Sequence, residues 1–185
     1  DIILEIVDAR LVELSRNEQV ERVVKESGRP LIFVVNKSDL VMKKSIHEQI
    51  KNLKEDGEVV FISAKRRKTM GILYSVIKKE FKKHGKKTRT EVEGKHKPRE
   101  AKADIVVGVL AYPNVGKSSI INMMAGKKKV KVSKRSGTTH GIHWIKATNE
   151  IKLIDSPGVI PLREDDDLRY GLIGARDSEK LRNPA

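Results

Sequence analysis

The chain alternates between short apolar runs and longer segments in which apolar residues recur at helical spacing. The apolar runs are short and rich in β-branched residues, which is typical of strands buried on both faces; they cover 2–7, 31–35, 59–62, 105–110 and 151–154. Helices are expected between most of them. This alternation predicts an α/β fold with a mostly parallel sheet and helices on both faces.

Helix boundaries can be read from capping signals. Residues 15–18, Ser-Arg-Asn-Glu, form one predicted capping box, and that helix should end near Ser27 with Gly28 as its C-cap. Residues 45–48, Ser-Ile-His-Glu, form a second capping box, and a third helix should close near His84. The apolar residues of the second and third helices are expected in the core; they are Ile46, Ile50, Leu53, Met70, Leu73, Tyr74, Ile77 and Phe81.

The spacing also predicts how the chain is organised. A single domain over 1–185 is expected, with halves 1–85 and 104–185 joined by a basic linker at 86–103. Within the second half, residues 140–147 and 150–154 predict a hairpin that turns at Thr148-Asn149. His140 and His143 fall on this hairpin and are expected to be exposed strand residues, not zinc ligands.

Composition excludes several classes of protein. The chain has no cysteine, so disulfides and thiolate metal sites are excluded, which fits a reducing compartment; we expect the cytoplasm. No apolar run approaches the roughly 18 residues of a membrane span, and the first residues do not resemble a signal peptide. The expected state is a monomer without a membrane association.

The positive net charge of the chain suggests a negatively charged binding partner. Its formal net charge is +14, from 39 basic and 25 acidic residues, and basic residues concentrate at 65–102 and 127–135. Contact with a polyanion, and in particular with an RNA backbone, is the natural inference. A solvated lysine-rich surface is the alternative. Aromatic residues make up 4% of the chain, which argues against stacking platforms for single-stranded nucleic acid.

The segment Ala111-Tyr-Pro-Asn-Val-Gly-Lys-Ser118 has the context of a phosphate-binding P-loop, because it lies between a buried strand and a helix start. Backbone N–H groups of residues 114–119 would face the phosphates; these residues are Asn114, Val115, Gly116, Lys117, Ser118 and Ser119. The Lys117 side chain would reach the β- and γ-phosphates, and the Ser118 hydroxyl would ligate Mg²⁺. The usual first glycine is replaced by Ala111. An ordinary turn with an incidental Gly-Lys-Ser is the alternative.

Residues 36–39, Asn-Lys-Ser-Asp, follow a buried strand and predict a guanine site. The Asp39 carboxylate can accept hydrogen bonds from guanine N1–H and N2–H, whereas adenine has no such pair of donors. Asn36 would support purine N7 and the neighbouring loop, and the stem of Lys37 would lie against the base. A polar turn is the alternative reading.

Three further segments complete the predicted site. Residues Ser63, Ala64 and Lys65 follow the next strand, where the Ala64 N–H could donate to guanine O6. Thr138 and Thr139 lie in a basic loop, and Thr139 is preferred over Thr138 as the residue that senses Mg²⁺. Asp155 would hold Mg²⁺ through water, and the Gly158 N–H would sense the γ-phosphate. The acidic run 165–167 is expected to be solvated.

Taken in order, these motifs resemble those of a Ras-like GTPase whose elements are rotated. The Asn-Lys-x-Asp, Ser-Ala-Lys, P-loop, Gly-Thr-Thr and Asp-x-Pro-Gly segments, together with Asp8-Ala9-Arg10 and residues 15–17, are similar to the circularly permuted GTPases of the YlqF/YawG family. The resemblance implies a P-loop GTPase fold, GTP or GDP with Mg²⁺, and a role in large-subunit ribosome assembly. Leu11-Val12 departs from the family pattern after Asp-Ala-Arg.

The resemblance also implies catalytic roles for Lys117, Asn114 and Thr139. Val159 stands where Ras-like enzymes carry the glutamine that orients water, so intrinsic turnover should be slow. Asn114 matches the asparagine that ligates K⁺ in related K⁺-activated GTPases. The main hypothesis is a GTP-hydrolysing switch. The alternatives are an RNA-associated guanine-nucleotide-binding module with vestigial turnover and, against the indication of Asp39, an ATPase or nucleotide kinase.

Overall fold

The computed structural model describes residues 1–66, 68–84, 105–126 and 143–155. Its strands are β1 (Ile2–Asp8), β2 (Leu31–Asn36), β3 (Glu58–Phe61), β4 (Ile105–Ala111), β5 (His143–Lys146) and β6 (Ile151–Asp155). Its helices are α1 (Glu18–Glu26), α2 (Lys43–Asp56), α3 (Thr69–His84) and α4 (Lys117–Met124), with short 3₁₀ turns at Glu13–Ser15 and Ser38–Leu40.

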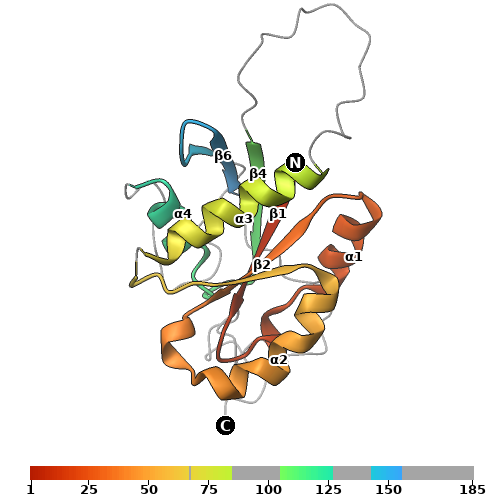
Figure 1. Cartoon of the computed structure of the whole chain (residues 1–185), viewed down its shortest axis with the longest axis vertical. Coiled ribbons are helices and arrows are strands. Elements are labelled where there is room, and N and C mark those ends of the chain that lie inside the picture. The colour runs from red at the N-terminus through yellow and green to blue at the C-terminus, as the bar shows by residue number, and fades with distance from the viewer. Residues whose placement is uncertain (67, 85–104, 127–142, 156–185) are drawn as a thin grey trace, which may run out of the picture.

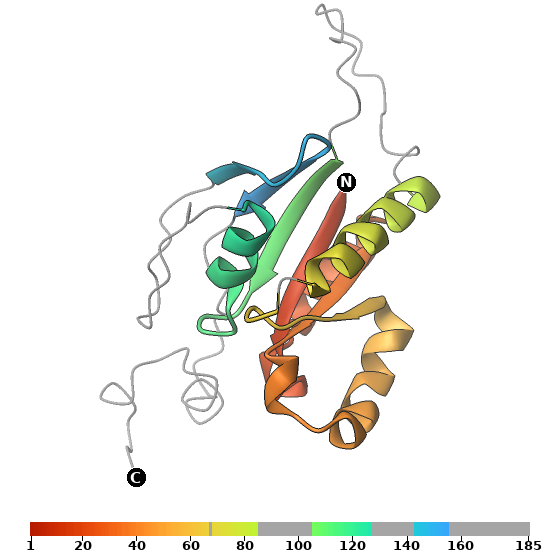
Figure 2. The same cartoon turned by 60° about the vertical axis from the view of Figure 1, so that its left-hand side comes forward.

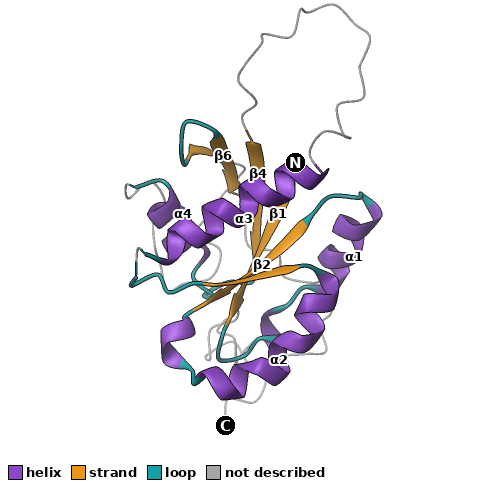
Figure 3. Cartoon of the chain, viewed as in Figure 1, coloured by secondary structure: helices purple, strands orange, loops and turns teal. Residues whose placement is uncertain are grey.

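The strands of the described segments form one sheet in the order β3-β2-β1-β4-β6-β5. All neighbouring pairs are parallel except β5 and β6, which are antiparallel. This confirms the predicted mostly parallel α/β fold, with the strands at the centre of the molecule (Figure 3). The halves of the chain meet where β1 pairs with β4, and Figure 2 shows these two strands running side by side in the same direction.

Helices cover both faces of the sheet, because alternate residues of each strand are apolar on opposite sides. The first face packs against α3 and α4 through Met70, Leu73, Ile77, Ile120, Ile121 and Met124. The second packs against α1 and α2 through Val24, Ile46, Ile50 and Leu53. In Figure 1, α3 passes in front of β1 and β4. The predicted core residues of α2 and α3 are therefore confirmed, with Tyr74 and Phe81 partly buried.

Both predicted capping boxes are wrong. Helix α1 begins at Glu18, and its N-cap is Asn17, whose side chain accepts a hydrogen bond from the Val20 N–H. Ser15 is instead buried: its hydroxyl donates to the carbonyl of Leu11 or Val12 and accepts from the Asp8 N–H. Helix α2 begins at Lys43, so the predicted cap at Ser45 already lies inside its first turn. For α1 a second polar residue, Asn17, provides the cap, whereas α2 begins after Met42 without a side-chain cap.

Other predicted boundaries are confirmed. Helix α1 ends where expected, although its C-cap is Ser27 and not Gly28; Gly28 follows at a φ of 65°, a conformation that suits glycine. The third helix ends at His84. Strands β5 and β6 form the predicted hairpin, on which His143 is exposed. No helix in the described segments is long and apolar enough to cross a membrane.

A buried ionic cluster fixes α1 to the sheet. Arg16 donates from Nε and Nη2 to the two carboxylate oxygens of Glu21, at 3.0 and 2.6 Å, and from Nη2 to Asp56 Oδ2 at 2.6 Å. The backbone N–H of Asn17 donates to Glu5 Oε1 at 2.6 Å. Burial, together with the neighbouring Glu21 carboxylate, raises the pKa of Glu5 to about 8. The segment 15–17 thus has a structural role that its sequence did not indicate.

Candidate functional site

The predicted site residues lie at one edge of the sheet, because parallel strands place their carboxyl ends together. Asp8 ends β1, directly beside Asn36 at the end of β2. Ala111 ends β4, and Asp155 ends β6 opposite Val109 of β4. The edge therefore collects three strand-terminal polar side chains around the loop that leaves β4.

That loop, residues 112–116, leads from β4 directly into α4. Asn114 and Gly116 adopt positive φ values of 63° and 104°, which fold the loop back over the end of the strand. Tyr112 and Val115 are buried and anchor it to the core cluster of α3 and α4. Helix α4 begins at Lys117, so its first backbone N–H groups follow the loop, as phosphate binding requires.

Asn36 joins the two predicted motifs. Its Nδ2 donates to the carbonyl oxygen of Val115 at 2.9 Å, across 79 positions of sequence. The same nitrogen lies 2.3 Å from the place that a Cβ on Gly116 would occupy, so glycine is required there by contact as well as by its φ. The expected contact of Asn36 with the neighbouring loop is present. Its Oδ1 is buried and has no hydrogen-bond partner among the described residues.

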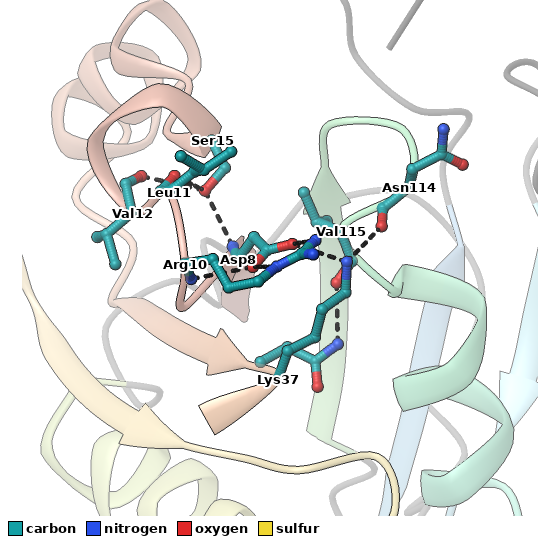
Figure 4. A network of polar contacts seen from close by, with 9 residues as sticks. Asp8, Arg10, Leu11, Val12, Ser15, Lys37, Asn114 and Val115 are labelled. Carbon is teal, nitrogen blue, oxygen red and sulfur yellow. Dashed lines mark hydrogen bonds and ion pairs between the residues drawn. The ribbon is translucent and has the colours of Figure 1, made fainter. Parts of the chain in front are cut away.

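A second connection runs from Lys37 through the network drawn in Figure 4. Lys37 Nζ donates to Asp8 Oδ2 at 2.7 Å and to the carbonyl oxygen of Asn114 at 3.0 Å. Arg10 donates to both oxygens of Asp8 from its side chain, and to Oδ1 from its backbone N–H. Burial alone would raise the pKa of Asp8, but the hydrogen bonds from Arg10 and Lys37 lower it to about 2. Asp8 is therefore a carboxylate at neutral pH.

Asp39 is held by the segment that follows β3. Ser63 Oγ donates to Asp39 Oδ1 at 2.8 Å, and Lys65 Nζ lies 3.6 Å from Asp39 Oδ2. The hydrogen bond from Ser63 is the main cause that lowers the pKa of Asp39. Ser38 fixes the same loop, since its backbone N–H and hydroxyl both donate to the Ile62 carbonyl. Ala64 is exposed beside this cluster.

Lys117 and Asp155 form a buried ion pair between α4 and the end of β6. Asp155 is fully buried, and its Oδ2 has no hydrogen-bond partner among the described residues. Ser118 is half-buried in the first turn of the helix that Lys117 begins. A hydroxyl and a carboxylate with an unused buried oxygen are donors that fit Mg²⁺, which prefers oxygen ligands and keeps several waters.

Several predicted residues lie outside the described segments, namely Thr138, Thr139, His140, Gly158, Val159, the linker 86–103 and the acidic run 165–167. The described residues include no group of three or more histidine, cysteine, aspartate or glutamate side chains that could hold a metal. The structure brings together Asn36, Lys37, Asn114 and Val115 in one group, Asp39, Ser63 and Lys65 in a second, and Lys117 with Asp155 in a third.

The sequence analysis missed the part that Asp8, Arg10 and Ser15 play in the site. The Ser15 hydroxyl accepts from the Asp8 N–H at 2.9 Å and so fixes the end of β1 (Figure 4). The signal available was an aspartate at the end of the strand that directly precedes the Asn-Lys strand in the chain. Because adjacent parallel strands end side by side, that aspartate could have been paired with Lys37.

Comparisons with known proteins agree with this geometry. Residues 106–181 match the family described as the 50S ribosome-binding GTPase. An uncharacterized GTP-binding protein of Methanocaldococcus jannaschii is 44% identical over 184 residues, which is 100% of this chain and 44% of that protein. Ribosome biogenesis GTPase A of Priestia megaterium is 36% identical over 174 residues, 93% of this chain and 58% of that protein. The chain thus spans about half the length of these curated relatives.

Solved structures share the fold. The GDP-bound structure of YlqF aligns with a TM-score of 0.60 at 21% identity, covering 98% of this chain and 65% of that one. YjeQ from Thermotoga maritima aligns with a TM-score of 0.53 at 17% identity, covering 85% of this chain and 48% of that one. The Asn-Lys-x-Asp strand also precedes the P-loop strand in the chain while lying on the same sheet. The chain is therefore similar to YlqF in fold and to ribosome biogenesis GTPase A in sequence, and its GTPase elements follow a circularly permuted order.

Proposed function

We propose that the chain binds GTP, hydrolyses it to GDP and phosphate, and acts as a switch in assembly of the large ribosomal subunit through contact with RNA. The observation that carries the nucleotide part is the hydrogen bond from Asn36 to Val115, because it fixes the predicted guanine loop to the predicted phosphate loop. A nucleotide with its base on one loop and its phosphates on the other would span this connection.

The base would be selected by Asp39. Its carboxylate is ionised and held by Ser63, so it can accept from guanine N1–H and N2–H, while the exposed Ala64 N–H donates to O6. Asn36 has a second Nδ2 hydrogen beyond the one given to Val115, and this hydrogen would serve purine N7. The stem of Lys37, held at its end by Asp8 and Asn114, would support the base. Lys65 lies beside Asp39, with its Nζ 3.6 Å from Asp39 Oδ2.

The phosphates would lie on the loop N–H groups of residues 114–119. Lys117 would move from Asp155 to the β- and γ-phosphates, which carry more negative charge than one carboxylate. Asp155, once released, could receive Mg²⁺ through water, with Ser118 and Thr139 as further ligands and Thr138 as the alternative to Thr139. Bound Mg²⁺ supplies positive charge to the phosphate oxygens. The Gly158 N–H would then sense the γ-phosphate.

Hydrolysis by the chain alone is expected to be slow. Val159 has no group to orient water, so the activating group must come from a partner or a cation. Asn114 is the proposed ligand for K⁺, and Figure 4 shows its side chain directed away from Lys37. Lys117, Asn114 and Thr139 are the proposed catalytic residues.

The ribosomal part of the proposal rests on relatives named ribosome biogenesis GTPase A and on the net charge of +14. We place the function in the cytoplasm, which fits a chain without cysteine, and expect a monomer. A nucleotide-binding module without useful turnover is the second candidate, because Val159 replaces the catalytic glutamine. The buried Lys117–Asp155 pair favours the GTPase hypothesis. It places side by side the lysine proposed for the phosphates and the aspartate proposed for Mg²⁺.

GTP turnover in K⁺ buffer, with and without purified large ribosomal subunits, tests the proposal. Stimulation by the subunits is expected. Tight GTP binding with the same very slow turnover in both conditions would favour the binding module. Equal competition by ATP and GTP for the site would contradict the role of Asp39 and with it the guanine assignment.

A further inference from the structure

The outer edge of the sheet carries an exposed tryptophan. Trp144 is the one tryptophan of the 185-residue chain, and it is 64% exposed on β5. Strand β5 lies at the end of the sheet, where its pairing within the described segments is with β6. Single exposed apolar side chains are common on protein surfaces. Whether Trp144 indicates a binding surface therefore depends on the residues around it.

The register of the hairpin places Trp144 among cations. Ile145 points into the core cluster of α3 and α4, so Trp144 and Lys146 point to the opposite face. Across the strands, Trp144 lies beside Ile154, and Lys146 lies beside Lys152. We call these four residues the Trp144 patch.

The two lysines of the patch occupy directly opposite positions of an antiparallel pair. Their positive charges therefore adjoin each other beside the indole, and one bound polyanion could interact with both. The acidic residue of the adjoining turn, Glu150, is ion-paired with Lys78 of α3. A flat aromatic surface with two adjacent cations is suited to a nucleic-acid base and its flanking phosphates.

We propose that the Trp144 patch binds one unpaired RNA base, which stacks on the indole while Lys146 and Lys152 contact the phosphates on either side of it. This inference rests on the RNA contact of the proposed function and assigns it to a surface. One aromatic side chain gives room for one base, which agrees with the low aromatic content and indicates a bulged or looped nucleotide within folded RNA. A protein partner is disfavoured because the cores of protein interfaces are depleted in lysine.

Trp144 fluorescence provides the direct test, since no other tryptophan contributes in this chain. Two RNA stems of equal length, each closed into a hairpin by a non-nucleotide linker so that no loop base is present, would be titrated, one fully paired and one with a single bulged nucleotide. The bulged hairpin should quench the emission as the base stacks on the indole. The fully paired hairpin should leave the emission unchanged, even where it binds through its backbone. Titration with GDP controls for a signal transmitted from the nucleotide site.

Variants separate stacking from charge. Trp144→Leu, measured with labelled RNA, should weaken binding of the bulged hairpin about 10-fold or more and leave the paired hairpin unaffected. Lys146→Gln with Lys152→Gln should lower the slope of log affinity against log salt by about 1 for each lysine. The matched control is Lys51→Gln with Lys54→Gln, two exposed lysines on α2, which should leave the slope unchanged. Wild-type GTP turnover in Trp144→Leu would verify the fold.

Each other outcome has a distinct meaning. RNA binding without quenching, and with wild-type affinity in Trp144→Leu, overturns this site while the RNA contact stands. Absence of binding to either hairpin and to ribosomal RNA overturns the RNA part of the proposed function itself. Equal quenching by both hairpins overturns the unpaired base. An emission change with RNA-free ribosomal proteins, and none with RNA, assigns the patch to a protein and overturns the proposal.

Discussion

The Lys37 ammonium donates to the carbonyl oxygen of Asn114 at 3.0 Å, and both residues have left-handed backbones, with φ values of 59° and 63°. Among the described residues these are the two non-glycine positions with positive φ. Such conformations cost free energy and persist where their surroundings hold them. The Lys37 side chain thus holds the backbone of Asn114 and adds a second connection between the guanine loop and the phosphate loop, beside the hydrogen bond from Asn36 to Val115.

Asp8 should therefore matter for nucleotide affinity without touching the nucleotide. Asp8→Asn removes the charge that positions Lys37, and the affinity for GDP should fall about 10-fold or more, as expected for a lost charge-assisted hydrogen bond. Calorimetric titration would measure it. Arg10→Gln is the matched control: it removes the other cation on Asp8 but leaves Lys37 in place, so its effect should be much smaller. Wild-type GDP affinity in Asp8→Asn would contradict this role.

Gly116→Ala should abolish nucleotide binding. The new methyl would lie 2.3 Å from Asn36 Nδ2 on a backbone with φ of 104°, so the loop must shift and the unfolding free energy should fall by about 1–3 kcal/mol. Gly71→Ala within α3 is the control, because no atom lies within 4 Å of its added Cβ; it should leave binding intact and raise stability by up to about 1 kcal/mol. Urea unfolding of both variants measures the change in stability, and GDP titration measures the change in nucleotide affinity. A fully active Gly116→Ala chain would show that the loop is not constrained as described.

Lys117→Met should destabilise the nucleotide-free protein as well as prevent phosphate binding. It leaves the fully buried Asp155 without its cation, which typically costs about 3–5 kcal/mol. The double variant Lys117→Met, Asp155→Leu removes both charges and should recover most of that loss, although it too cannot bind GTP. Urea unfolding of the single and double variants measures this coupling. If the double variant were less stable than Lys117→Met, with the losses in unfolding free energy adding, the coupling between Lys117 and Asp155 would be refuted.

Glu5 should make stability fall as pH rises. Its pKa is about 8 in the folded chain against an ordinary value of 4.5, so the native state holds more protons than the unfolded state between these values. The unfolding free energy should drop across this window by up to about 1.4 kcal/mol per pH unit. Glu5→Gln mimics the protonated group and should remove this part of the slope. Urea unfolding at pH 5 and pH 8, with the exposed Glu26→Gln as control, tests the sign.

Asn114 should determine the choice of monovalent cation. Asn114→Ala is expected to abolish any preference for K⁺ over Na⁺ in GTP turnover. Because Asn114 has a positive φ, Asn114→Gly provides a companion variant that removes the side chain without backbone strain. Both variants retaining the K⁺ preference would rule out the assignment.

The order of elements and the polar strand ends could be predicted from sequence because each has a local signal. Buried parallel strands are continuous apolar runs, and the residues after them gather at one edge whatever the connections. Asn36, Asp39 and Lys117 were identified in this way, and each lies at that edge in the structure.

Contacts between distant residues carried no such signal. The pairing of Lys117 with Asp155 and of Arg16 with Asp56 depends on which elements become neighbours in space. The misplaced helix start at Ser15 has the same origin, because its hydroxyl is used by the end of β1. A capping pattern is read from neighbouring residues alone, so it does not show whether the serine hydroxyl is used instead in a tertiary hydrogen bond.

The pairing of β1 with β4 has a consequence for synthesis of the chain. Asp1 and Val106, 105 positions apart, meet in the structure, so β1 is made long before its second neighbour. Until then β1 has one partner, β2, and an apolar strand edge that can pair wrongly. Closing so long a loop is slow, and transiently exposed edges aggregate. The interval of synthesis before β4 emerges should therefore be the time at which this order of elements most needs a chaperone.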